Sequence, residues 1–125
     1  MAGAEWLIDL FAPFGPVKTR RMFSGHGIYA DGLIIALAAR GEVWLKADAE
    51  TERLFEAAGS RRFEYEMRGR IARLPYWTLP DAAQDDPDAM NLWAGRALEA
   101  SRRAARDKQK PRREKPRSKR QSKLQ

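Results

Sequence analysis

The side chains that could do chemistry are concentrated in the run RRMFSGHGIY at residues 20–29, which holds the only histidine of the chain. A Ser-His-Asp triad would have to combine His26 with Ser24 and with Asp31 across a turn, and no nucleophile elbow or oxyanion signature surrounds them. A zinc site would need cysteine or further histidine, and the chain has no cysteine. The acidic segment 81–88 lacks the spacing of a calcium loop. The sequence therefore predicts no catalytic residue, no metal site and no cofactor.

The two glycines of this run, Gly25 and Gly27, are superficially similar to those of a phosphate-binding loop. The lysine of a P-loop is missing, and no helix is expected directly afterwards to supply a positive N-terminal end. A bulge or tight bend that joins two strands is the better interpretation.

Arg20 and Arg21 are adjacent on an expected strand, so they should point to opposite faces and cannot easily clamp one phosphate together. Either they form a solvated or ion-paired strand edge, or one of them meets a partner. The pair Tyr76 and Trp77 leaves a similar choice between an exposed aromatic patch and a half-buried one.

Charge divides the chain in two. Residues 1–101 hold 12 Lys and Arg against 15 Asp and Glu, a net charge of −3, whereas residues 102–125 hold 12 against 2, a net charge of +10. The end of the chain has almost no apolar side chains, so it cannot offset the entropy of ordering. We expect a folded domain at residues 1–105 and a disordered basic tail at residues 106–125.

The tail is a candidate for non-specific binding of DNA or RNA through phosphate contacts, with strong salt dependence and no reading of bases. The alternative is that it only keeps the protein soluble. The candidate contact residues are its cations, namely Arg106, Lys108, Lys110, Arg112, Arg113, Lys115, Arg117, Lys119, Arg120 and Lys123. No apolar run approaches bilayer length, and the N-terminus lacks the positive charge of a secretory signal, so we expect a cytoplasmic protein.

The elements that must position these residues begin with a helix at residues 5–11, whose apolar positions Trp6, Leu7, Leu10 and Phe11 share one face. Three hairpins follow, with turns at residues 31–32, 40–41 and 68–69; the Asp-Gly turn favours type I′ geometry. The apolar segment 33–37 should be a central strand.

Two further helices are expected. Asp48 is a candidate N-cap for a helix at residues 49–58 that ends at Gly59. A last helix should begin at Asp86 with Pro87 in its first turn and continue into residues 102–106.

These elements predict an α+β fold, with an antiparallel sheet of about five to six strands built from hairpins. N- and C-terminal helices and one short inserted helix should flank it. The expected core is Trp6, Leu10, Phe11, Phe23, Ile28, Leu33, Ile35, Leu37, Trp44, Leu54, Phe55, Phe63, Tyr65, Leu74, Trp93 and Ala97.

The run at residues 20–29 resembles the signature of the TfoX/Sxy N-terminal domain family. The likeness continues, in the same order, through LKAD at 45–48, FEAAG at 55–59, YWTLP at 76–80 and DPDA at 86–89. The matching motif positions, which are the candidate partner-binding residues, are Arg20, Arg21, Met22, Phe23, Gly25, Gly27 and Tyr29. Ser24 stands where glycine is common in the family.

The resemblance implies a bacterial, non-enzymatic regulatory domain that contacts a protein partner, with a transcription-related role. Full-length members of the family regulate natural-competence genes together with the cyclic-AMP receptor protein, and they carry a helical C-terminal domain. This sequence has the basic tail where that domain would stand, so it is expected to be a single-domain member.

Overall fold

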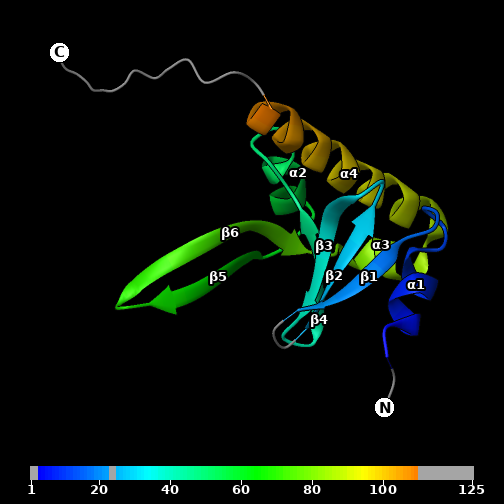
Figure 1. Ribbon diagram of the computed structural model, residues 1–125, viewed down its shortest axis with the longest axis horizontal. Helices are drawn as coiled ribbons and strands as arrows, with labels where there is room; N and C mark the ends of the chain where they lie inside the picture. The colour runs from blue at the N-terminus through cyan, green and yellow to red at the C-terminus, as the bar shows by residue number, and fades with distance from the viewer. Residues whose placement is uncertain (1–2, 23–24, 110–125) are drawn as a thin grey trace.

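The computed structural model describes residues 3–22 and 25–109 (Figure 1). Its elements follow the chain in the order α1 (Glu5–Phe11), β1 (Lys18–Met22), β2 (Gly25–Ala30), β3 (Leu33–Ala39), β4 (Glu42–Lys46), α2 (Glu52–Ala57), β5 (Arg62–Met67), β6 (Arg70–Thr78), α3 (Asp81–Asp85) and α4 (Pro87–Gln109). The described strands form one six-stranded antiparallel sheet in the order β1-β2-β3-β4-β6-β5. The predicted α+β fold with hairpin-built strands is confirmed.

The three predicted hairpin turns all have the geometry of type I′. Both residues of each turn have positive φ: Asp31 and Gly32 (53° and 76°), Arg40 and Gly41 (57° and 75°), and Arg68 and Gly69 (54° and 78°). This geometry matches the right-handed twist of the flanking strands, so the turns set the register of the hairpins. As expected, β3 is a central strand that pairs with β2 and β4.

The helices pack on one face of the sheet, where they form the main core. Figure 1 shows α4 lying along the sheet, whereas the β5–β6 hairpin extends away from the helices. Every helix contributes to this cluster, which includes Leu7 and Phe11 of α1, Phe55 of α2, Ala83 of α3 and Met90, Trp93, Ala94, Ala97 and Leu98 of α4. The sheet supplies residues such as Ile28, Ala36 and Leu45. Burial of this apolar surface holds the helices to the sheet.

Part of the predicted core was wrong. Trp6 is 49% exposed and Leu54 is 36% exposed. The reason in α1 is its rotation, because Leu7 and Phe11 point into the core and leave Trp6 at the border. Five further positions are only partly buried: Leu10, Leu33, Leu37, Tyr65 and Leu74. Phe23 lies outside the described residues.

The predicted start of the inserted helix was also wrong. The helix begins at Glu52, and the Asp48 carboxylate instead accepts hydrogen bonds from the Glu50 amide (3.2 Å), the Thr51 hydroxyl (3.2 Å) and the Arg103 guanidinium (2.6 Å). The partner on α4 is distant in sequence, so local pattern could not reveal it. Gly59 ends the helix with a φ of 83°, as predicted.

At the last helix, Asp86 acts as the predicted cap, since its carboxylate accepts a hydrogen bond from the amide of Asp88 (2.9 Å). The short helix α3 before it was not predicted. Helix α4 continues through residues 102–106 to Gln109, past the domain boundary predicted at residue 105. Within the described ranges, no helix is long and apolar enough to cross a membrane.

Candidate functional site

Those sequence-predicted partner residues that the structure describes lie on β1 and β2, at one edge of the sheet. Arg20 is paired with Gly27, and Arg21 is paired with His26, so the two exposed arginines project to opposite faces. The Arg20 guanidinium carbon lies 5.5 Å from the centre of the Tyr29 ring. The hairpin therefore brings Arg20 and Tyr29 together and separates both from Arg21.

The two motif glycines have a packing role. A Cβ on Gly25 would lie 1.9 Å from the carbonyl oxygen of Ala38 in β3. A Cβ on Gly27 would meet the ends of three side chains, those of Tyr29, Met22 and Ile34, at 3.0, 3.1 and 3.2 Å. Both glycines belong to β2, and the next described helix begins only at Glu52. Their place inside a strand, with no described helix directly after them, does not fit a phosphate-binding loop, and the predicted bend between the two strands falls on residues 23–24, outside the described residues.

The predicted tail is described only at its beginning. Arg106 and Lys108 are exposed in the last turns of α4. The other candidate cations of the tail, from Lys110 to Lys123, lie outside the described residues, as does Phe23 of the motif.

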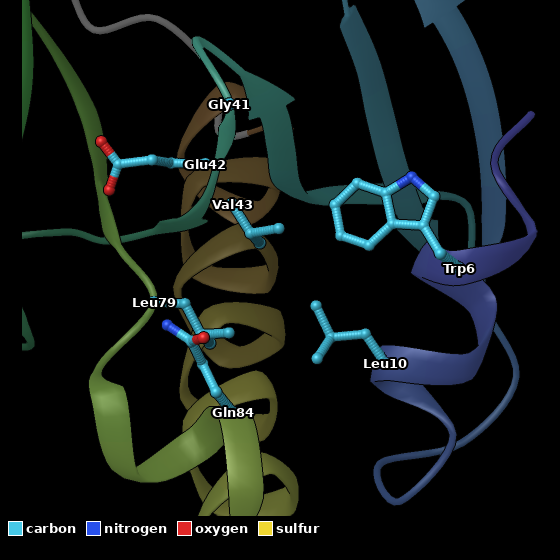
Figure 2. Close-up of a pocket in the computed structure, with 7 residues that line it drawn as sticks. All are labelled: Trp6, Leu10, Gly41, Glu42, Val43, Leu79 and Gln84. Atoms are coloured by element: carbon cyan, nitrogen blue, oxygen red, sulfur yellow. The ribbon is translucent and has the colours of Figure 1, made fainter. Parts of the chain in front are cut away.

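The structure adds a pocket that the sequence did not indicate. It opens between α1, the start of β4 and α3, and is lined by Trp6, Leu10, Gly41, Glu42, Val43, Leu79 and Gln84. Figure 2 shows Trp6 and Leu10 facing Val43 and Leu79 across the opening. The volume is about 210 Å³, below the ~300–1,000 Å³ of typical small-molecule sites. The pocket has room for a single apolar side chain.

The polar groups of the pocket do not form a reactive centre. The carboxylate of Glu42 is turned away from the Trp6 indole (Figure 2) and pairs with the guanidinium of Arg61. Gln84 offers a neutral amide at the rim. The lining residues include no histidine, serine, threonine or cysteine, and their one carboxylate is engaged by Arg61.

The pair Tyr76 and Trp77 does not form an exposed aromatic patch, because both side chains are only 8% exposed. They point to opposite faces of β6. Trp77 belongs to the main core, and Tyr76 belongs to a second cluster with Trp44 and Phe63. Burial, followed by the nearby Tyr29, raises the pKa of Tyr76 to about 12.

No three histidine or carboxylate side chains within residues 3–22 and 25–109 are grouped so that they could hold a metal ion. The acidic residues at 81–88 serve α3 and the cap of α4 instead.

Comparison with known proteins decides the family. A family model described as the TfoX N-terminal domain matches residues 9–101. The chain belongs to the TfoX N-terminal domain family. It is 24% identical over 98 residues to a protein of Aliivibrio fischeri (strain ATCC 700601 / ES114) described as "DNA transformation protein TfoX1". The match covers 78% of this chain and 47% of the relative, so the chain spans about half the length of that protein.

In this TfoX N-terminal domain, the described part of the signature run lies on β1 and β2, and the pocket beside Trp6 lies at a different place. The pocket combines residues 6–10, 41–43 and 79–84, three segments that only the fold brings together. One signal was available, since Trp6 stands at the edge of the apolar stripe of α1, where exposure is compatible with helical periodicity.

Proposed function

We propose that this TfoX N-terminal domain is a non-enzymatic regulatory domain that acts by binding a protein partner. The name of its Aliivibrio fischeri relative refers to DNA transformation, so we propose that this is the process the domain regulates. The observation that carries the proposal is the half-exposed Trp6 at the mouth of a small pocket of mixed polar and apolar lining.

Trp6 has the features of an interface anchor. Tryptophan is enriched among the residues that dominate binding energy, above all next to pockets that a partner fills. The indole is 49% exposed, and Leu10, one turn further along α1, continues the apolar rim. A large apolar side chain from a partner would cover the rim and the pocket, and would remove this surface from water.

The pocket size and chemistry favour a protein partner over a substrate. The volume of about 210 Å³ leaves no room for a typical cofactor. Glu42 is already paired with Arg61, so its carboxylate is not offered to a substrate as a free base.

The test is gene replacement in the organism that encodes the chain. The measurements are transformation frequency and competence-gene transcripts, with protein abundance determined in parallel. Trp6→Glu should reduce both readouts toward those of the deletion strain. Ile71→Glu, at a side chain 59% exposed on β6, is the matched control and should behave as wild type. Wild-type behaviour of Trp6→Glu would refute the role of the pocket in partner binding. Wild-type behaviour of the deletion strain would refute the proposal that the domain regulates DNA transformation.

A further inference from the structure

The second face of the sheet carries an aromatic cluster built from strand residues. Trp44, Phe63 and Tyr76 are buried there, and Leu37, Ala39, Tyr65 and Leu74 pack against them. The pairing of Leu37 with Trp44, and of Lys46 with Tyr76, places these residues on the side opposite the main core. Among the described residues, no helix contributes to this cluster. We call this side the open face.

Cations lie over the rings of the open face. The distances from the charged group to the ring centre are 4.1 Å for Arg40 over Phe63, 5.4 Å for Lys46 over Tyr76, 5.5 Å for Arg20 over Tyr29 and 5.9 Å for Arg61 over Trp44. The contacts extend from β1 at one edge of the sheet to β5 at the other, so the cations are distributed across its width. In each contact the charged group itself lies over the ring; Arg20, Arg40 and Arg61 are exposed, and Lys46 is half-buried.

The open face is positive although residues 1–101 have a net charge of −3. Strand alternation puts Glu64 and Glu66 on the face opposite Phe63 and Tyr65. Glu42 is paired with Arg61, so these two charges cancel and the positive charge of this face comes from Arg20, Arg40 and Lys46. Because positive and negative side chains are separated between the two faces, the open face can attract polyanions even though the net charge of residues 1–101 is negative.

We propose that the open face binds single-stranded nucleic acid, which goes beyond the protein contact proposed for the pocket on the helix side. Contact with a ring restrains the arginine or lysine side chain before any nucleic acid binds. The N–H groups of the side chain can still donate hydrogen bonds to phosphate. Tyr29 and Tyr65 are half-buried and provide ring surface for bases. Cations interleaved with aromatic rings on a sheet are the arrangement by which single strands are bound.

The adjacent arginines of β1 give a matched test in the full chain. Arg20→Gln and Arg21→Gln make the same change of charge in the same strand, but on opposite faces. Fluorescence anisotropy of a labelled 12-residue oligothymidylate should be measured over a series of salt concentrations. Arg20→Gln should weaken binding several-fold and reduce the slope of log K against log salt by about 0.7, the contribution of one phosphate on a single strand. Arg21→Gln should leave both quantities unchanged.

Tyr29→Leu separates stacking from charge. It should weaken binding on the order of tenfold with an unchanged salt slope, because the loss of one stacked base removes no cation. Urea unfolding of each variant shows whether the fold is kept, and only variants with a wild-type midpoint count. Cross-linking with a 5-bromouracil oligonucleotide then locates the strand, and cross-links at Tyr29 or Tyr65 are expected.

Four results would overturn the proposal. The first is that Arg20→Gln and Arg21→Gln have equal effects, and the second is that the cross-links are confined to residues 110–125. The third is that a 12-base-pair duplex binds as tightly as the single strand. The fourth is that polyglutamate competes as well as unlabelled oligothymidylate. The last would indicate an acidic protein segment as the occupant. None of these outcomes depends on Trp6, so failure here is distinct from failure of the proposed function.

Discussion

Replacement of Gly25 by alanine should destabilise the domain strongly, because it forces apart two strands at the centre of the family signature. The new Cβ would lie 1.9 Å from the carbonyl oxygen of Ala38 and 3.4 Å from the Cα atom of Ala39. Both neighbours are backbone, so no side chain can move aside to make room. The strands β2 and β3 would have to separate locally.

The size of the effect follows from that separation. Carbon and oxygen atoms of adjacent strands normally approach to about 3.3–3.6 Å, so the strands must move apart by about 1.5 Å near Gly25. Loss of about two ladder hydrogen bonds costs ~0.5–1.5 kcal/mol each. Overpacking strain adds ~1–3 kcal/mol. The expected loss is therefore about 2–6 kcal/mol, a large part of the ~5–15 kcal/mol that holds a typical domain together.

The assay is urea unfolding followed by circular dichroism, with Gly27→Ala as the control. A Cβ on Gly27 meets only the ends of the side chains of Tyr29, Met22 and Ile34, at 3.0–3.2 Å, and these can shift by a few tenths of an ångström. Its unfolding free energy should stay within about 1 kcal/mol of wild type, since alanine also reduces the entropy of the unfolded chain. Equal stabilities of the two variants, or the reverse order, would refute the close approach of β2 and β3.

Four further predictions concern stability and titration. Gly32→Val should lower the unfolding free energy by about 1–2 kcal/mol, because φ is 76° there even though the Cβ would have free space. Gly95→Ala should raise the unfolding free energy by about 0.5–1 kcal/mol, because a glycine inside helix α4 is replaced where nothing blocks a Cβ. Urea midpoints test both. The hydrogen bond from Arg103 lowers the pKa of Asp48 below its ordinary 3.8. The ionised carboxylate therefore stabilises the fold above pH 3.8, and this stabilisation is lost as the pH falls through the pKa of the folded state. Asp48→Asn should be less stable than wild type at pH 7, and the difference in unfolding free energy should shrink in acid. Tyr76 should ionise at about pH 12 by ultraviolet titration, a step that Tyr76→Phe removes.

The elements that the sequence predicted are those with local causes. A type I′ turn is selected by two residues that tolerate positive φ, so Asp31 and Gly32 identify the hairpin without knowledge of the rest of the chain. The cap at Asp86 is equally local, because its carboxylate bonds the amide two residues later. The opposite faces of Arg20 and Arg21 follow from strand alternation alone.

What could not be predicted depends on tertiary contacts. Periodicity places Trp6 and Leu7 on one side of α1, but the packing of the helix decides that only Leu7 is buried. Asp48 is held by Arg103, which is 55 residues away in the sequence. The pocket needs three separate segments, so its existence depends on the strand order and not on any motif.

The family signature therefore contains two kinds of residue. Gly25 and Gly27 are needed because neighbouring atoms occupy the space where a side chain would stand, which is sufficient to explain their presence. Arg20 has no such packing requirement, since it is exposed and its guanidinium lies over the half-buried ring of Tyr29. If the motif served the fold alone, Arg20→Gln and Arg21→Gln would both be silent. A functional difference between these two variants, at equal stability, would assign the role to the face toward which Arg20 points.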